Sequence, residues 1–199
     1  MKKLPILTLL ILSVFFSQSA SALSLKALYE RLKFVDDNYE VVGTICEQVA
    51  KLEIESEINT NKYYVELGIV YENSQRVLGE LDVVVFRKQD HEAVLISEVK
   101  CWKKFRGARK KASDQLNRFR RTMESNQNIT LYSSSNRNRF YKTSQFDENP
   151  SLIAISQKGG VKSGFERELE QNLDELMQLR KHILRCQRQG ECKSPYYTQ

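Results

Sequence analysis

Two short apolar segments near the middle of the chain predict a β-hairpin. Residues 79–86 and 94–102 are rich in Val, Leu, Ile and Phe, and Gly or polar residues bound each of them. Short apolar runs with β-branched residues and such boundaries are typical of strands. The polar segment 87–92 predicts the turn between them. We therefore expect two adjacent antiparallel strands.

Three charged residues interrupt this apolar pattern. Asp82 lies early in the first strand, and Glu98 and Lys100 lie at the end of the second. Because side chains alternate along a strand, Glu98 and Lys100 are predicted to face the same side. Antiparallel pairing places the start of the first strand beside the end of the second. Two carboxylates and one ammonium group are thus expected to converge at one end of an apolar sheet.

The periodicity of the remaining apolar residues predicts four helices and three further strands. Helices are expected where apolar residues recur every three or four positions, and strands where they alternate. A polar loop is expected at residues 133–149. The predicted helices span residues 23–34, 39–54, 103–124 and 165–186, and the further strands span residues 62–71, 129–132 and 152–156.

Two local patterns give finer expectations. The segment 37–40, Asp-Asn-Tyr-Glu, has the spacing of a capping box, so the second helix is expected to begin near Tyr39. In the strand 62–71, alternation predicts one shared face for Tyr63, Val65, Leu67, Ile69 and Tyr71.

Glu47, on the helix 39–54, is a candidate third carboxylate. Gly43 lies four residues before it and therefore shares its helix face. A Gly inside a helix costs about 1 kcal/mol relative to Ala and is tolerated where the helix approaches a sheet closely. Glu47 would then point along that contact, although from this helix alone a solvated Glu47 is the simpler interpretation.

The helix 103–124 combines an apolar stripe with a strongly basic surface. Gln115 lies beside the stripe. A basic run is usually a solvated face, but this one follows the charged strand end directly, and such clusters attract phosphate groups. The candidate nucleic-acid-binding residues are Lys103, Lys104, Arg106, Arg109, Lys110, Lys111 and Arg118.

The first 22 residues have the pattern of an export signal. Lys2 and Lys3 precede an apolar run at residues 4–16, and a Ser- and Ala-rich segment ends in Ala-x-Ala. Because the run is short for a membrane span, we expect a cleaved signal peptide at residues 1–22 and a single periplasmic or secreted domain at residues 23–199 without a membrane span. An uncleaved anchor is the alternative. Removing both lysines lowers the formal charge from +6 to +4.

Export makes the four cysteines disulfide candidates. They are even in number and all follow the predicted signal peptide. Cys186 and Cys192 bracket a tight segment, which favours a local bridge, and Cys46 would then pair with Cys101. Four cysteines allow three connectivities, and the sequence does not choose among them. Their spacing does not suggest a zinc site.

Clustered carboxylates in a partly dry site repel each other unless a cation lies between them. Oxygen ligands without Cys or His favour Mg²⁺ or Mn²⁺. Such a metal can polarise a phosphodiester and activate water, and Lys100 beside that water could orient it or stabilise the developing charge. The residues therefore predict phosphodiester chemistry, with the basic helix holding the nucleic-acid backbone.

These residues resemble the PD-(D/E)xK nuclease superfamily. The motifs are Gly79-Glu80-x-Asp82, then Glu98-x-Lys100 at a strand end, with Gly43-x-x-x-Glu47 upstream and Gln115 in the following helix. Leu81 stands where the family name has Pro. The resemblance covers about residues 39–156 and is nearest to the branches that resemble restriction endonucleases and Holliday-junction resolvases. It implies an α/β fold with a central mixed sheet flanked by helices, an αβββαβ core and here an added C-terminal helix.

The resemblance also implies roles for individual residues. Asp82 and Glu98 would bind Mg²⁺ or Mn²⁺ together with the backbone carbonyl of Val99, and Glu47 would bind directly or through water. Lys100 would position or activate the attacking water. Gln115 would orient the site or contact the substrate.

Three functions compete at this point. The first is an exported metal-dependent nuclease that acts on nucleic acid, with DNA preferred over RNA as the expected substrate. The second is a non-catalytic nucleic-acid-binding or interaction module on the same fold. The third is an envelope protein in which Asp82, Glu98 and Lys100 form a structural ion-pair cluster.

Overall fold

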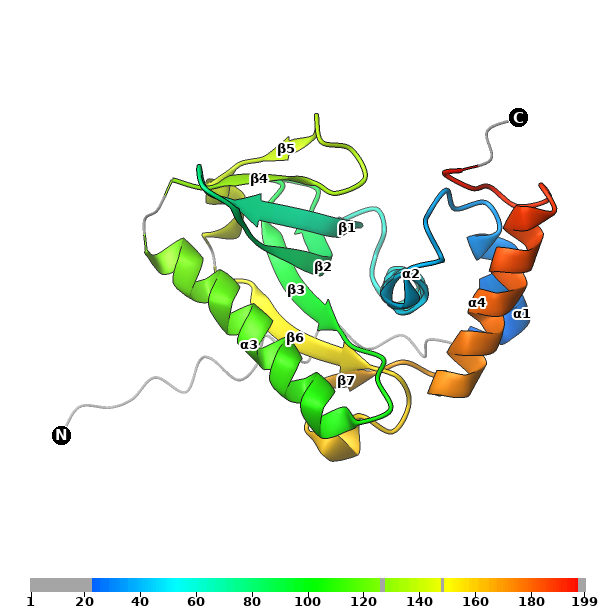
Figure 1. Ribbon diagram of the computed structural model, residues 1–199. Helices are drawn as coiled ribbons and strands as arrows, with labels where there is room; N and C mark the ends of the chain where they lie inside the picture. Colours follow the sequence, from blue (N-terminus) through cyan, green and yellow to red (C-terminus); the bar gives the residue numbers. More distant parts are fainter. Residues whose placement is uncertain (1–22, 126–127, 148, 197–199) are drawn as a thin grey trace.

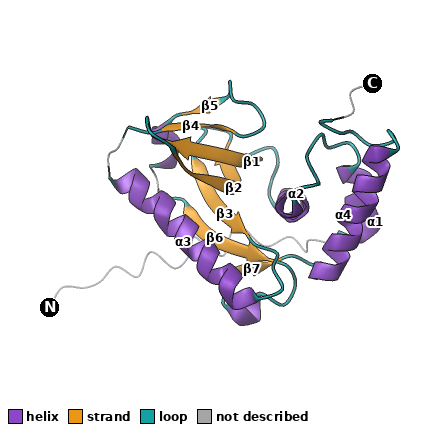
Figure 2. Ribbon diagram, viewed as in Figure 1, coloured by secondary structure: helices purple, strands orange, loops and turns teal. Residues whose placement is uncertain are grey.

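The computed structural model describes residues 23–125, 128–147 and 149–196. In this part of the chain, a seven-stranded mixed sheet is flanked by helices on both faces (Figures 1 and 2). The predicted α/β class is therefore confirmed. The predicted signal peptide, residues 1–22, lies outside the described residues.

The central hairpin of the sheet has the predicted pairing. The order of the strands is β5-β4-β1-β2-β3-β6-β7, in which β1, β2 and β3 are antiparallel neighbours. β6 runs parallel to β3, and β7 runs parallel to β6, which makes the sheet mixed. The strands are β1 (Tyr63–Glu72), β2 (Val77–Arg87), β3 (Ala93–Val99), β4 (Thr130–Ser133), β5 (Phe140–Tyr141), β6 (Ser151–Ser156) and β7 (Arg167–Glu168).

The helices divide between the two faces of the sheet. α3 packs on one face, whereas α2 lies on the other, with α1 and α4 packed behind it (Figure 1). Two short 3₁₀ helices, η1 and η2, flank β6 in the chain. The elements are α1 (Leu25–Leu32), α2 (Val42–Glu57), α3 (Phe105–Glu124), α4 (Leu173–Arg188), η1 (Thr143–Phe146) and η2 (Val161–Ser163).

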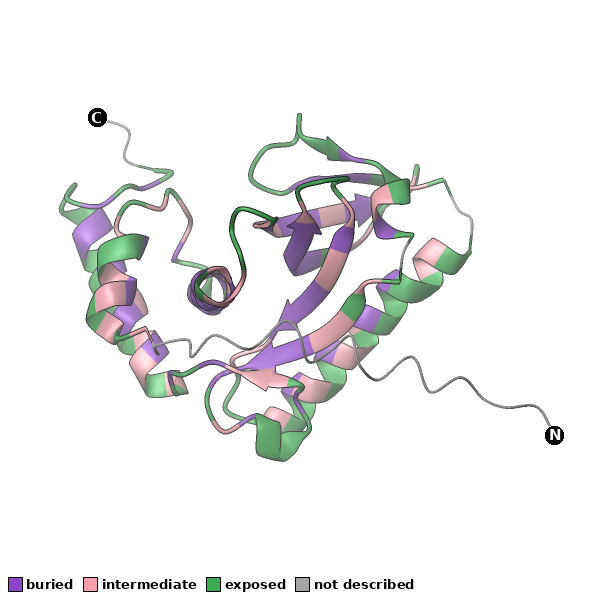
Figure 3. Ribbon diagram, turned by 180° about the vertical axis from the view of Figure 1, so that it is seen from behind, coloured by how far each residue is buried: buried purple, intermediate pink, exposed green. Residues whose placement is uncertain are grey.

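Each face of the sheet has its own hydrophobic core. On the α2 side, Val83, Val85 and Val99 pack against α2 and α4. On the α3 side, Val84 and Phe86 pack against α3. Full burial of one such side chain contributes about 1.5–3 kcal/mol. Figure 3 shows the buried residues concentrated in the central strands, while the outer surface of α3 is largely exposed.

The predicted single face of β1 is wrong. Val65 and Leu67 belong to the core on the α2 side, whereas Ile69 and Tyr71 belong to the core on the α3 side. The change occurs at Gly68, whose φ of 62° lies in the left-handed region that favours Gly. A residue in this conformation rotates the strand, so the simple alternation of faces is lost at that point.

The irregularity at Gly68 also affects β2 at Asp82. The pairs Leu67–Val83 and Ile69–Leu81 flank this position. Leu81 faces the α3 side and Val83 faces the α2 side, so β2 changes face as well. Asp82 therefore lies where both central strands depart from regular alternation.

The second helix begins later than predicted. α2 starts at Val42, and its N-cap, Val41, makes no side-chain capping bond. The Asp37 carboxylate instead accepts hydrogen bonds from Asn38 N at 2.7 Å and Gln48 Nε2 at 2.6 Å. The segment therefore folds back on the second turn of the helix and does not cap its first turn.

The last helix also begins later than predicted. η2 and β7 precede it, and α4 starts at Leu173 after a capping box between Asn172 and Glu175. Arg167, in β7, donates to the Glu57 carboxylate at 2.6 and 2.8 Å. This contact with α2 is distant in sequence, so helical periodicity could not reveal it.

The predicted loop 133–149 contains a short strand and a 3₁₀ helix. Tyr141, in β5, stacks on Phe86 with ring centroids 5.6 Å apart, and Phe146, in η1, contacts the same ring edge-on at 5.7 Å. Each element is too short to produce a hydrophobic period. Aromatic packing at the end of the hairpin orders this segment.

Two disulfides join the four cysteines in the pairing that the local spacing favoured. Cys186–Cys192 closes a short loop at the end of α4. Cys46–Cys101 joins α2 to the segment that follows β3. Two disulfides suggest an oxidising, exported environment. Within the described ranges, no helix has both the length and the apolar character that crossing a membrane requires.

We predict that the two disulfides contribute unequally to stability. The bridged cysteines are 55 residues apart in Cys46–Cys101 and 6 apart in Cys186–Cys192. In the chain-entropy model these loops correspond to about 4 and about 2 kcal/mol. Urea unfolding of the Cys46→Ser/Cys101→Ser variant should show the larger loss, with Cys186→Ser/Cys192→Ser as the matched control. Equal losses would contradict this ranking.

Candidate active site

The β2–β3 hairpin brings the three predicted charged residues together. Val83 pairs with Ser97, so Asp82 and Glu98 lie on neighbouring strands next to that pair. Lys100 follows the last residue of β3, and its backbone N–H donates to Ile155 O at 2.9 Å. The pairing of β3 with β6 therefore continues to Lys100 and fixes its backbone.

The Lys100 ammonium group contacts three oxygen atoms. It donates to Asp82 Oδ2 at 3.2 Å and to the Val99 carbonyl at 3.2 Å. It also makes a short hydrogen bond and ion pair with Glu98 Oε1. Asp82 Oδ2 accepts a further bond from Val99 N at 2.8 Å, which orients the carboxylate. Three oxygens from two strands thus converge on one cation.

This cluster is largely removed from solvent. The exposed fractions of the side chains are 1% for Glu98, 10% for Asp82 and 14% for Lys100. Glu98 Oε2 is buried and has no hydrogen-bond partner in the described structure. Since a buried carboxylate oxygen without a partner is costly, this atom is available to a further ligand.

The electrostatics of the cluster follow from this burial. Burial and the nearby Asp82 carboxylate raise the pKa of Glu98 to about 9, and Lys100 opposes that shift. Burial lowers the pKa of Lys100, but the Asp82 and Glu98 carboxylates outweigh it, and the net shift is upward. The site therefore retains its ammonium group and strongly favours a positive charge beside the carboxylates.

Glu47 approaches the same cluster from α2. Burial, followed by the charges of Asp82 and Glu80, raises the pKa of Glu47 to about 8. A Cβ atom added at Gly43 would lie 2.9 Å from Glu47 Oε1. Gly43 is exposed in the first turn of α2, so it does not face the sheet as predicted. The space that a side chain would fill at Gly43 is taken by the Glu47 carboxylate.

The Cys46–Cys101 disulfide joins residues adjacent in sequence to two of these groups. Cys46 precedes Glu47, and Cys101 follows Lys100. The bond therefore joins the two chain segments that carry the third carboxylate and the lysine. It holds α2 against the end of β3.

The oxygen donors fit a small divalent cation. Asp82, Glu98 and the Val99 carbonyl already surround one positive group, and Mg²⁺ commonly uses one or two carboxylates and completes its octahedron with waters and substrate phosphates. In the described part of the chain, no group of three or more His, Cys, Asp or Glu side chains is arranged as a ready-made metal site.

Gln115 is not joined to the carboxylates by any contact among the described residues. It is half-buried on α3, and its side-chain oxygen is buried without a hydrogen-bond partner in that part of the structure. The structure therefore places Gln115 on the α3 side of the sheet and gives it no direct link to Lys100 or Glu98.

The predicted nucleic-acid-binding residues divide into two groups. Arg109 and Lys110 have protein partners: Arg109 bonds Gly164 O at 2.6 Å and pairs with Glu166, and Lys110 pairs with Asp114 at 2.8 Å. Arg109 therefore helps to attach η2 and the following segment to α3. The other five are exposed and form no ion pair with a described residue, although Arg118 donates to Leu78 O at 3.2 Å; they are Lys103, Lys104, Arg106, Lys111 and Arg118.

Sequence reasoning gave no role to three residues near the site. Glu80 raises the pKa of Glu47, and its position two residues before Asp82 could have indicated a shared strand face. Asp37 acts on Glu47 in the same direction but lies in a segment taken for a helix cap. Arg76 lies in the β1–β2 turn, where no periodic pattern marks it.

We predict a pH-dependent stability effect at Glu47. Its pKa of about 8 in the folded protein exceeds the ordinary value of 4.5, so the folded state binds the proton more tightly, and the stabilisation from protonation is lost as pH rises toward 8. Glu47→Gln has no carboxyl group at this position, so its stability does not fall with pH for this reason. The free energy of unfolding of Glu47→Gln relative to wild type, measured by urea denaturation in EDTA, should increase from pH 5 to pH 8 (~1.4 kcal/mol per pKa unit at most).

The matched control is Glu55→Gln on the same helix, where Glu55 lies 3.8 Å from Lys51. Its effect relative to wild type should not grow over that pH range. An equal effect of Glu47→Gln at every pH would contradict the assignment of a buried, proton-binding carboxylate.

The chain was compared with known proteins in three ways. A scan against protein-family models, a search of curated proteins and a search of solved structures each return no match.

Proposed function

We propose that the protein is an exported, metal-dependent nuclease that hydrolyses phosphodiester bonds, with DNA as its main substrate. The observation that carries the proposal is the convergence of Asp82 Oδ2, Glu98 Oε1 and the Val99 carbonyl on the Lys100 ammonium group. These are the metal ligands and the lysine that the PD-(D/E)xK resemblance implies, brought together by strand pairing.

The arrangement of the elements supports the proposed restriction-endonuclease-like core. α2 precedes the antiparallel strands β1, β2 and β3, and α3 follows them. β6 then lies beside β3 in parallel orientation. This succession corresponds to the αβββαβ core of the superfamily, with β4 and β5 as an additional edge and α4 as the added helix.

In the proposed reaction, Asp82, Glu98 and the Val99 carbonyl would hold Mg²⁺ or Mn²⁺, and Glu47 would bind it directly or through water. When bound, the metal would polarise the phosphodiester and lower the pKa of water. Lys100 supplies an ammonium group that can orient the attacking water and stabilise negative charge on the phosphate. The buried setting strengthens each of these electrostatic interactions.

The substrate side of the proposal depends on the basic surface that begins at the site. Lys103 and Lys104 follow Lys100 by a few residues and are exposed, as are Arg106 and Lys111 on α3. Cationic side chains in this position can bind nucleic-acid phosphates. Gln115, further along α3, would orient the site or contact the substrate.

A second candidate function is a non-catalytic nucleic-acid-binding module on the same fold. Lys100 forms ion pairs with both carboxylates without a metal, which is the observation that favours it. In this case the charged cluster is structural and the basic surface alone is functional. Binding would then survive Glu98→Gln, and the wild-type protein would not cleave with Mg²⁺.

We predict metal-dependent cleavage that requires the clustered residues. Refolded, oxidised protein should cleave plasmid or linear DNA in Mg²⁺ or Mn²⁺ but not in EDTA. Glu98→Gln and Asp82→Asn keep the side-chain shapes but remove the ligand charges, and they should lower the rate on the order of 100-fold or more. Gel electrophoresis of timed samples measures the rates, with single-stranded DNA and RNA as further substrates.

Glu124→Gln is the matched control, because Glu124 is exposed near the end of α3 and outside the cluster. It should cleave at the wild-type rate. Thermal unfolding of each variant establishes that it is folded. Absence of cleavage of every substrate by the folded wild-type protein, with either metal, would overturn the nuclease proposal.

A further inference from the structure

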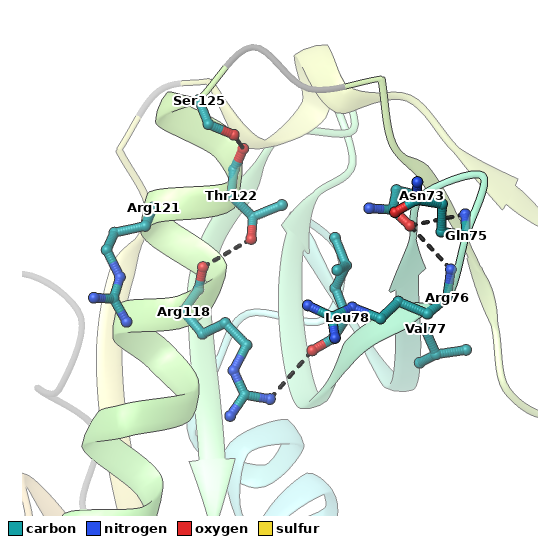
Figure 4. A pocket seen from close by; sticks show the side chains of 9 residues that line it. All are labelled: Asn73, Gln75, Arg76, Val77, Leu78, Arg118, Arg121, Thr122 and Ser125. Atoms are coloured by element: carbon teal, nitrogen blue, oxygen red, sulfur yellow. Dashed lines mark hydrogen bonds between the residues drawn. The ribbon is translucent and has the colours of Figure 1, made fainter.

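A basic hollow lies between the β1–β2 turn and the second half of α3 (Figure 4). Its volume is about 620 Å³. Three of its lining residues are arginines, and none of the described residues that line it is acidic. The lining residues are Asn73, Gln75, Arg76, Val77, Leu78, Arg118, Arg121, Thr122 and Ser125.

Arg76 and Arg118 reach this hollow from different elements. Figure 4 shows Arg118 extending from α3 toward Leu78 and Arg76 extending from the turn toward the same residue, whereas Arg121 extends from the other side of the helix. Arg118 Nη1 donates to Leu78 O at 3.2 Å. Two guanidinium groups are thus directed into one space, and the third lies at its rim.

No described acidic side chain lies within ion-pair distance of the three arginines, although Arg118 interacts electrostatically with Asp114, one turn earlier on α3. Neither Arg76 nor Arg121 forms an ion pair or a side-chain hydrogen bond with another described residue, and Arg118 bonds only a neutral carbonyl. Guanidinium groups have a donor geometry that matches phosphate oxygens. A phosphate group is therefore the ligand that this chemistry would recognise.

The backbone around Arg76 is held in place. Asn73 Oδ1 accepts hydrogen bonds from the N–H groups of Gln75 and Arg76, both at 3.0 Å, and Asn73 N donates to Arg76 O at 3.0 Å. Arg118 is carried by a regular helix. Both arginines thus extend from ordered backbone, which lowers the entropy lost when a ligand orders their side chains.

The hollow and the carboxylate cluster both include residues of β2. Leu78 lies four residues before Asp82 on this strand, which corresponds to about 13 Å at about 3.3 Å per residue. Tyr71 connects the two regions electrostatically: burial raises its pKa to about 12, with Arg118 lowering and Glu98 raising it. One nucleic-acid strand can therefore reach both places.

We propose that the Arg76–Arg118 hollow binds a backbone phosphate of the nucleic-acid substrate at a distance from the phosphate that is cleaved. This inference rests on the proposed function and adds a second contact to it. The hollow determines the direction in which the strand leaves the carboxylate cluster, along β2 toward the β1–β2 turn. The hollow would contact phosphate and not the bases. It would therefore contribute to the affinity for nucleic acid and to the position of the strand on the protein, but not to sequence preference.

The test measures DNA binding without cleavage. Anisotropy of a short fluorescein-labelled DNA duplex, titrated with the full oxidised chain in EDTA, gives the affinity over a series of salt concentrations. Each lost phosphate contact lowers the steepness of log affinity against log salt by about 0.9. Arg76→Gln should show this loss, and Arg76→Gln/Arg118→Gln should show a larger one. Arg76 makes no side-chain bond to another described residue, so the single variant is expected to fold.

Arg120→Gln is the matched control, because Arg120 is an exposed residue of α3 that does not line the hollow. Its salt dependence should equal that of the wild type. Equal slopes for Arg76→Gln and Arg120→Gln would overturn the inference, as would a wild-type protein that does not bind DNA. If DNA binds with the expected slopes but is not cleaved in Mg²⁺, the phosphate-binding role of the hollow would be supported and the proposed nuclease activity would be overturned.

Discussion

The structure depends on the neutralisation of two carboxylates that strand pairing forces together. Asp82 and Glu98 lie on neighbouring strands and are almost fully buried. At an effective dielectric constant of about 20, two like charges about 4 Å apart repel by about 4 kcal/mol. Lys100 reduces this repulsion by pairing with both carboxylates. It can do so because it follows β3 on the face of Glu98 and its side chain is long enough to reach both groups. Without a cation at this point, the centre of the sheet would contain uncompensated charge.

A buried ion pair alone is a poor means of stabilising a sheet, because apolar side chains of the same size often serve as well or better. Several groups in this site also remain unsatisfied: Glu98 Oε2 has no partner among the described residues, and the pKa of Glu47 is raised by burial and by Asp82. An arrangement designed only for stability would not gather more carboxylates than its lysine can satisfy. This excess of acidic groups supports the proposal that the cluster receives a divalent cation.

The parts that could be predicted from the sequence are those set by local patterns. Apolar runs predicted the central hairpin. Antiparallel pairing placed Asp82 beside the end of the second strand, and the period of two there placed Glu98 and Lys100 on one face. The change of face at Gly68 could not be predicted, because a single Gly does not report its φ angle. The late starts of α2 and α4 arise from Asp37 bonding Gln48 and from Arg167 bonding Glu57, which are tertiary contacts. Arg76 was missed because turns have no hydrophobic period. Its proposed role also depends on Arg118, which comes from a helix that is distant in sequence.

The Cys46–Cys101 bridge connects the environment of the protein with the geometry of its candidate site. The sheet itself fixes Asp82, Glu98 and Lys100, since hydrogen bonds of β2, β3 and β6 hold their backbones. Glu47 instead lies on α2, which packs on the sheet through apolar side chains. A covalent bond between the residue before Glu47 and the residue after Lys100 adds a direct link between these two segments. Because this bond persists only under oxidising conditions, the position of the third carboxylate depends on the compartment in which the chain folds.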